Sequence, residues 1–562
     1  MMHSVGMIRE QIAERVSAAL AALGLPVAGV IVEYIEDAAH GDITTNAAMV
    51  VAKAGGKAPR ALAEDLLAAL GEIEGVEKAE IAGPGFINFT FTSTTLAAAV
   101  SAALDEGGKW GKSATREGEV VMVEYTQPNP FKEFHVGHLM GNVIGESLAR
   151  LIESAGAKVI RANYQGDVGV HVACAIWGIK KLGIDPSTAD EFGTAYVAGA
   201  AAYKDDPIAK SEIDAINTKL YERSDPELNA LYDSGREKSL AAFERIYAIL
   251  GTKFDHYFFE SETGPIGKEI VLAHPELFPE SDGARIFKGE EYGLHTRVFI
   301  NAKGLPTYEA KELGLEKLKK DLYPETTLLV IETANEINEY FKVIAKALEL
   351  IYPAIAAQLK HVSHGLMKLP TGKMSSRTGS IITGESLLND LRDAAKERAS
   401  ESRADDHEQL AEAIAVAAIK YQILRQASGK DIIFDRERAL SLEGDSGPYI
   451  QYAYARASSV IAAAAEAGVK AVVEAPQTSD ERAVARLLMQ FPFVVNRAQE
   501  SYEPHHVATY AAQLAGLYNG WYAREHVIGT DAAPRRTAIT HAVAITLRNA
   551  LYLLGIEAPM RM

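Results

Sequence analysis

The stretch VVMVEYTQPNPFKEFHVGHLMGN, residues 120–142, joins a run of β-branched and apolar residues to a helical pattern through a polar loop. Apolar side chains recur at helical spacing from Val136 to Glu153. A second unit follows, in which AKVIRANY, residues 157–164, leads into GDVGVHVACAIWGIKKLG. Strands that alternate with helices predict a parallel, doubly wound, Rossmann-like α/β sheet. Ligands of such sheets bind beyond the carboxyl ends of the strands, where both polar loops fall.

Two histidines stand at the start of the first helix. His135 and His138 are three residues apart, with Gly137 between them. The first turn of a helix offers unpaired N–H groups and the positive end of the helix dipole, which suits phosphate. Gly137 would let an extended ligand lie close to the helix. Metal binding, phosphate binding, and simple capping and packing all remain open for this pair.

Length and composition limit the class of protein. A chain of 562 residues should form about three or four domains. With 48% hydrophobic and 23% charged residues, it reads as soluble and globular, without a membrane span or a signal peptide, and we expect it in the cytoplasm. The single cysteine, Cys174, excludes a disulfide framework and a thiolate zinc site, so no metal site is expected. A net charge of -18 favours a small-molecule enzyme, and nucleic acid would need a local basic patch.

Changes of pattern along the chain predict the domains. Residues 1–110 form an N-terminal α+β module, and residues 104–119 read as a linker. Residues 119–383 form the sheet domain, with a charged helical insertion at about 182–250. Residues 384–562 show helical spacing almost throughout and predict an all-α bundle.

A second motif indicates nucleotide chemistry. LPTGKMSSRTGS, residues 369–380, sets Lys373, two serines and Arg377 between Gly372 and Gly379. A mobile basic loop with hydroxyl donors suits the β- and γ-phosphates of ATP, whose charge grows in the transition state. An exposed, solvated turn is the alternative. The two motifs together favour the ATP site.

At this point the chain resembles a known family. HVGH after a strand that ends in TQPN, followed by KMSSR before a helical region, is similar to class I aminoacyl-tRNA synthetases. Several stretches narrow the resemblance to the arginyl-tRNA synthetases, namely QPNPFKEFHVGHL, VIRANYQGDVG, FDHYFFES, GLPTYEAKELG, HVSHGLMKLPTGKMSSRTG, GDSGPYIQYAYAR and LYLLGIEAPMRM. The N-terminal HGDITTNAAM looks like that family's module for the tRNA elbow.

The resemblance implies an arginine–tRNA ligase. Such an enzyme activates L-arginine with ATP, accompanied by Mg²⁺, and transfers it to the 3′ end of tRNA(Arg). We expect the enzyme to be a monomer that binds no structural zinc and does not associate with a membrane. Two alternatives are a catalytically silent tRNA-binding paralogue, which would be free to lose the HVGH and KMSSR residues, and a small-molecule nucleotidyltransferase, which would not need the terminal modules.

The resemblance also assigns residues. Those with catalytic roles are His135, His138 and Lys373. Those that would bind ATP are Lys132, Gly137, Gly166, Asp167, Gly169, Met374, Ser375, Ser376 and Arg377. Those that would bind arginine are Asn129, Glu260, Tyr308 and Glu312, and carboxylates fit this role because they accept both prongs of a guanidinium.

The C-terminal assignment and three departures complete the comparison with the family pattern. GPYIQYAYAR carries the residues that would meet tRNA, namely Tyr449, Gln451, Tyr452 and Arg456. A tyrosine stripe that packs in the bundle core is the alternative. Glu312 stands where the family favours Asp, Ser376 replaces a lysine, and Met140 occupies a common arginine position.

Overall fold

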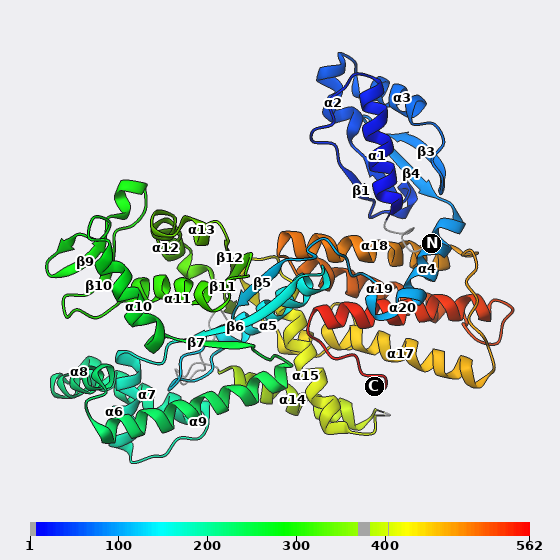
Figure 1. The fold of residues 1–562 in the computed structure, drawn as a ribbon. Coiled ribbons are helices and arrows are strands. Elements are labelled where there is room, and N and C mark those ends of the chain that lie inside the picture. Colours follow the sequence, from blue (N-terminus) through cyan, green and yellow to red (C-terminus); the bar gives the residue numbers. More distant parts are fainter. Residues whose placement is uncertain (1–6, 369–382, 403) are drawn as a thin grey trace.

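The computed structural model describes residues 7–368, 383–402 and 404–562. Figure 1 shows an N-terminal module, a central α/β region and a C-terminal helical bundle. The predicted fold class is confirmed in all three parts. No helix within the described residues is long and apolar enough to cross a membrane.

The N-terminal module is a four-stranded antiparallel sheet covered by helices. Its strand order is β1-β2-β4-β3. Ile8, Ile12, Val16 and Leu20 are buried at helical spacing on the first helix, as their sequence pattern predicts. The elements are α1 (Met7–Ala22), β1 (Val32–Tyr34), β2 (Ile43–Thr45), α2 (Ala47–Gly55), α3 (Pro59–Leu70), β3 (Val76–Ala82) and β4 (Phe86–Phe91).

The predicted linker is instead packed against the bundle. Helix α4 (Ser93–Glu106) extends into it, and the Trp110 side chain is only 3% exposed. The Asn549 side chain donates hydrogen bonds to the carbonyls of Gly107 and Trp110, each at 2.9 Å. The glycines of this segment suggested flexibility, but the burial of Trp110 by distant residues outweighs that local signal.

The central region is a five-stranded parallel sheet of order β12-β11-β5-β6-β7. Its strands are β5 (Val120–Glu124), β6 (Lys158–Gln165), β7 (His256–Phe259), β11 (Leu328–Ala334) and β12 (Leu359–His364). The two predicted strand–helix units are β5 with α5 (Val136–Ser154) and β6 with α6 (Val170–Leu182). Parallel pairing brings the carboxyl ends of β5, β6 and β7 to one edge, where the sequence motifs meet.

Helices and a small second sheet complete the central region. The charged insertion is helical, as predicted, with α7 (Ala189–Asp205), α8 (Pro207–Glu222) and α9 (Pro226–Leu250). The small sheet has the order β10-β9-β8. The other elements are α10 (Glu260–Ala273), β8 (Glu280–Ser281), β9 (Ala284–Phe287), β10 (Arg297–Ile300), α11 (Tyr308–Leu322), α12 (Asn338–Ile351), α13 (Pro353–Ala356) and β13 (Met367–Lys368).

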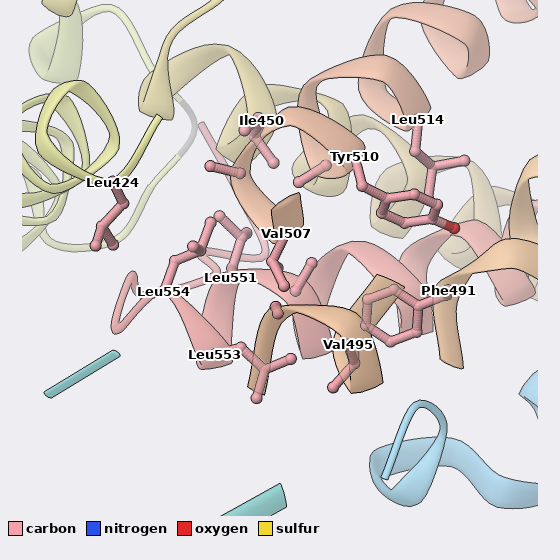
Figure 2. Packing of buried hydrophobic residues seen from close by; sticks show 14 of the residues in the cluster. Leu424, Ile450, Phe491, Val495, Val507, Tyr510, Leu514, Leu551, Leu553 and Leu554 are labelled. Carbon is pink, nitrogen blue, oxygen red and sulfur yellow. The ribbon is translucent and has the colours of Figure 1, made fainter. Parts of the chain in front are cut away.

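The C-terminal part is a helical bundle, and Figure 2 shows how apolar side chains from several of its helices meet in one core. It comprises α14 (Gly384–Ser400), α15 (His407–Leu424), β14 (Ile432–Ile433), α16 (Arg436–Ala439), α17 (Gly447–Glu466), α18 (Ser479–Ser501), α19 (His505–Arg524) and α20 (Ala533–Leu553). The bundle is joined to α5, because the Ser147 hydroxyl donates to the carbonyl of Leu553 at 2.9 Å.

A buried charge cluster joins the N-terminal module to α18, above which that module stands in Figure 1. Asp42, only 2% exposed, lies 3.0 Å from both Arg482 and Arg486. Arg482 also donates to the carbonyl of Phe91 at 2.9 Å. These contacts place the aspartate of the HGDITTNAAM stretch at an internal interface.

Candidate active site

The two histidines of HVGH cap the first turn of α5. The Gly137 N–H donates to His135 Nδ1 at 3.1 Å, and the His135 N–H approaches His138 Nδ1 at 3.3 Å. The two rings stack with their centroids 3.5 Å apart. Capping, one of the three alternatives left open by the sequence, is therefore present, but it occupies only the Nδ1 atoms.

These contacts fix the protonation of both rings. Because each Nδ1 accepts a hydrogen bond, the proton of each neutral imidazole is on Nε2. Burial, and then the charge of Lys132, lower the pKa of His135 to about 4. Burial also lowers the pKa of His138 well below its ordinary value, helped by His135 and Lys132. Both rings are thus neutral Nε2–H donors at physiological pH, which suits hydrogen bonding to phosphate oxygens.

Gly137 is required by the ring of His135. A Cβ at this position would lie 2.9 Å from His135 Cε1 and 3.0 Å from its Nδ1. The space that we expected to be free for a ligand is therefore filled by the histidine itself. The glycine lets the ring fold over the helix terminus.

Lys132 is a half-buried cation beside the histidines. Its Nζ lies 4.5 Å from the centroid of the Tyr196 ring, on the helical insertion. Burial lowers its pKa, and Glu133 is the main opposing charge. The positive field at the α5 terminus therefore combines Lys132 with the helix dipole.

The segment that follows the second motif returns to the same place. Thr383 forms an isolated antiparallel bridge with His135, and the Gly384 N–H donates to the Phe134 carbonyl at 2.6 Å. The predicted nucleotide-binding residues Lys373, Met374, Ser375, Ser376 and Arg377 lie outside the described residues.

Three residues assigned to different motifs meet at the end of β6. A Cβ on Gly166 would lie 2.3 Å from Asn129 Oδ1 and 3.1 Å from Glu260 Oε1. The amide of the TQPN loop and the carboxylate of FES therefore both pack on the bare backbone of Gly166. Glu260, the first residue of α10, is only 5% exposed. The parallel order β5-β6-β7 produces this convergence.

Glu260 is already paired with a cation. Lys311 Nζ donates to Glu260 Oε2 at 2.5 Å, and the two side chains are 5% and 6% exposed. Burial raises the pKa of Glu260, although Lys311 opposes the shift. Tyr308 lies one turn before Lys311 on α11 and is 62% exposed, with its ring centroid 5.3 Å from Lys311 Nζ.

Glu312 belongs to a buried acidic cluster. Lys319 Nζ lies 2.5 Å from both Glu124 and Glu316, and all four side chains are largely buried. Burial raises the pKa of Glu312 well above its ordinary value, and Glu124 raises it further, while Lys319 opposes them. Glu260 also raises this pKa, because its negative charge disfavours a second negative charge on Glu312.

Asp167 organises the loop that follows β6. Its carboxylate is fully buried and accepts hydrogen bonds from the Ser261 N–H at 2.9 Å, the Ser261 hydroxyl at 2.7 Å and the Tyr232 hydroxyl at 2.9 Å. Both oxygens are thus engaged by α9 and α10. Gly169 is the N-cap residue of α6 and has a φ of 127°, a backbone conformation that favours glycine.

The residues assigned to tRNA on α17 differ in accessibility. Gln451 is fully buried and donates to the carbonyls of Ala413 at 3.2 Å and Glu557 at 2.8 Å, so we do not carry it into an RNA surface. Arg456 is half-buried and donates to Asn519 at 2.6 Å and to the Tyr452 hydroxyl at 2.8 Å.

Arg456 also lies between two aromatic rings. Its guanidinium carbon is 4.5 Å from the Tyr452 ring and 5.3 Å from the ring of Tyr522 on α19. Tyr449 is half-buried on the same helix. A partly exposed stack of two tyrosines and one arginine therefore remains.

Two residues near the site were not singled out from the sequence. Lys311 lies in the YEAKE stretch itself, and a lysine beside two carboxylates was a signal that could have revealed it. Glu332 on β11 gave no such signal. Its side chain is 1% exposed, approaches His364 Nε2 at 3.4 Å, and accepts no hydrogen bond from any residue that the structure describes.

The described residues contain no group of three or more His, Cys, Asp and Glu side chains that could hold a metal ion. The geometry therefore offers the N-terminus of α5 for phosphate and the buried side chains of Glu260 and Glu312 for a cation, and no preformed metal centre within those residues.

Comparison with known proteins identifies the family. A model described as "tRNA synthetases class I (R), catalytic domain" matches residues 99–436. "Arginyl tRNA synthetase N terminal domain" matches residues 8–91, and "DALR anticodon binding domain" matches residues 450–562. The chain belongs to the arginyl-tRNA synthetase family. It is thus an aminoacyl-tRNA ligase, of a family that uses ATP as a substrate.

Individual relatives align with nearly the whole length of the enzyme. It is 30% identical to the arginine–tRNA ligase of Clostridium perfringens, over 91% of this chain and 92% of the relative. It is also 30% identical to that of Lactococcus lactis subsp. lactis, over 99% and 100%. The solved arginyl-tRNA synthetase of Thermus thermophilus aligns with a TM-score of 0.81 and 25% identity, over 98% and 99%.

These findings confirm the resemblance and the predicted arginine–tRNA ligase function. They give no support to the silent paralogue or to the small-molecule nucleotidyltransferase. Membership of the family implies tRNA, L-arginine and ATP as partners. The assigned site residues, in contrast, remain predictions to which the structure adds geometry.

Proposed function

We propose that the enzyme activates L-arginine at the carboxyl edge of β5, β6 and β7 and then transfers it to tRNA(Arg). In the first step, the arginine carboxylate attacks the α-phosphorus of ATP, and pyrophosphate leaves. In the second step, a ribose hydroxyl of the terminal adenosine attacks the carbonyl of arginyl-adenylate, and AMP leaves. Each step exchanges one acyl or phosphoryl bond for another, so no covalent enzyme intermediate is needed.

The observation that carries this proposal is the convergence of Asn129 and Glu260 on Gly166, near Lys132, whose charge acts on both Glu260 and His135. Glu260 and Glu312 would accept the guanidinium, because a planar fork pairs with carboxylates more specifically than a point charge does. Asn129 would hold the polar end of the amino acid. Tyr308, which is 62% exposed, would close over the bound side chain.

The neutral Nε2–H groups of His135 and His138 would donate to the phosphates. A donor that is neutral and fixed by its Nδ1 contact needs no reorganisation as charge moves toward pyrophosphate. Lys132 adds a cation at the same terminus, and Lys373, on the basis of its sequence motif, would balance the departing pyrophosphate. Mg²⁺ would arrive with ATP as part of the substrate.

The stack of Tyr452, Arg456 and Tyr522 on the bundle would bind the tRNA. Aromatic faces accept bases, and an arginine between them adds attraction to phosphate. A monomer in the cytoplasm is the simplest state for this function, and light scattering after size-exclusion chromatography measures its mass.

The decisive experiment is ATP–pyrophosphate exchange with each of the twenty amino acids, with and without tRNA. We expect exchange with L-arginine alone to exceed exchange with every other amino acid. Exchange with a different amino acid, or none with L-arginine in the presence of tRNA, would contradict the proposal.

A further inference from the structure

The proposed arginine pocket contains a cation of its own. Lys311 Nζ lies 2.5 Å from Glu260 Oε2, and the side chains of this pair are 5% and 6% exposed. Since Glu260 is proposed to accept the guanidinium, the inference below rests on the proposed function. A positive charge placed in a pocket for a positive substrate needs a physical reason.

Close backbone packing fixes this lysine in the pocket. A Cβ on Gly267 of α10 would lie 1.8 Å from the Ala310 carbonyl oxygen, and one on Gly314 of α11 would lie 2.1 Å from the Thr263 carbonyl oxygen. The two helices therefore touch through glycines, on both sides of Lys311. Their register sets Lys311 opposite Glu260, the first residue of α10.

Lys311 stays charged in this setting. Burial has the largest single effect and lowers its pKa, but Glu260, Tyr221 of the helical insertion and Tyr308 together raise it, so that the pKa lies above its ordinary value. The ammonium is therefore a permanent part of the pocket at physiological pH. It lies three residues after Tyr308 on α11, a spacing that puts these two side chains on one helix face.

The ion pair leaves only part of Glu260 for a substrate. Oε2 is occupied by Lys311, whereas Oε1 lies toward Gly166, 3.1 Å from where a Cβ on that residue would be. A guanidinium spreads its charge over a planar fork and can reach Oε1 together with Glu312. A compact ammonium concentrates its charge and would have to share Glu260 with a second ammonium.

We propose that Lys311 is a specificity-determining residue, which favours L-arginine over L-lysine and L-ornithine by repelling a second compact ammonium at Glu260. Discrimination of this kind acts against the competitor rather than for the substrate. Its size is a ratio of two kcat/KM values. The ratio, rather than the rate with arginine, is what a change at Lys311 should alter.

The test compares Lys311→Met and Lys311→Gln with the parent in tRNA-supplemented ATP–pyrophosphate exchange, using L-arginine, L-lysine and L-ornithine. Both variants should lower the ratio of kcat/KM for arginine to that for lysine or ornithine by at least about tenfold. Lys311→Gln offers an uncharged donor on a shorter side chain, and Lys311→Met keeps the length without a donor, so an effect shared by both variants follows the loss of the charge. Lys317→Met, which removes an exposed lysine paired with Asp321 on the same helix, is the matched control and should leave the ratio unchanged.

A parallel Glu260→Gln variant separates the two proposals. If Glu260→Gln leaves the KM for arginine unchanged, the proposed pocket is wrong. If it raises that KM while folded Lys311→Gln and Lys311→Met keep the parental ratio, Lys311 is only a structural partner of Glu260, and the specificity inference is overturned while the proposed function stands. A thermal melt of each variant identifies the folded ones, and Lys311→Gln is the deciding variant if Lys311→Met unfolds.

Discussion

Replacement of Gly166 by alanine is the most direct test of the proposed arginine pocket. The new methyl group would lie 2.3 Å from Asn129 Oδ1 and 3.1 Å from Glu260 Oε1. Gly166 does not have a left-handed φ, so the alanine adds no backbone strain of that kind. The whole effect should come from the collision with the two side chains that we assign to arginine.

The size of the effect follows from these distances. Favourable contacts lie at about 3.5 Å, so the Asn129 amide must move by roughly 1 Å, and the Glu260 carboxylate by less. Overpacking of a filled site typically costs about 1–3 kcal/mol. If this falls on substrate binding, kcat/KM for arginine should drop by about 5- to 150-fold. Displacements of about 1 Å at reacting groups are known to reduce rates by about 10²-fold, within the same range.

The assay is ATP–pyrophosphate exchange as a function of arginine concentration, next to a thermal melt. Gly108→Ala is the matched control, because a Cβ there would meet no atom within 4 Å and the residue has no positive φ. We expect Gly166→Ala to raise the KM for arginine, and the KM for ATP is measured beside it because the family resemblance also assigns Gly166 to ATP. A Gly166→Ala enzyme with parental kinetics would show that Asn129 and Glu260 do not form the pocket.

Three further predictions concern the other parts of the enzyme. Lys373→Ala should slow adenylate formation by about 10²-fold or more with little change in arginine binding, because its ammonium meets charge that develops in the transition state; equal single-turnover rates would rule this out. Arg456→Ala should weaken tRNA binding, and the dependence of log tRNA affinity on log salt concentration should fall by about one phosphate contact, with no change in ATP affinity. A lower melting temperature with an unchanged salt dependence would instead make Arg456 a structural partner of Asn519. The pKa of His135 is lowered to about 4, so the unfolded chain binds more protons than the folded protein below pH 6.5. The free energy of unfolding should therefore fall as the pH drops from about 6.5 to 4. His135→Gln should reduce the dependence of that free energy on pH by about one proton, as measured by urea titrations at several pH values.

Much of the catalytic fold could be predicted from local patterns. The first strand–helix unit is a β-branched run followed by helical spacing, and α5 ends within one residue of the predicted Glu153. The convergence of TQPN and FES follows from the parallel sheet, because the carboxyl ends of β5 and β7 flank that of β6. Motif position and sheet topology together therefore suffice to gather Asn129 and Glu260.

The features that the sequence did not predict depend on distant contacts. The family resemblance assigned Gln451 to tRNA, yet its side chain is buried and donates to carbonyls of α15 and of the C-terminal segment. The glycine-rich segment near Trp110 reads as a linker in the sequence, but in the structure the Asn549 side chain of α20 donates a hydrogen bond to the Trp110 carbonyl. Lys311 is a charged residue on a helix, and only the close contact of α10 with α11 turns it inward. No local periodicity encodes such pairings.

A common property of the site is that its polar groups are engaged before any substrate arrives. His135 and His138 use their Nδ1 atoms at the helix terminus, Glu260 holds Lys311, and burial with Glu124 raises the pKa of Glu312. Arginine must then share Glu260 with Lys311, so the measured affinity is a difference between the contacts that it gains and those already present. This prior engagement limits the acceptors that are left for the substrate. It also orients the histidines in advance, so that the chemical step requires little rearrangement of the protein.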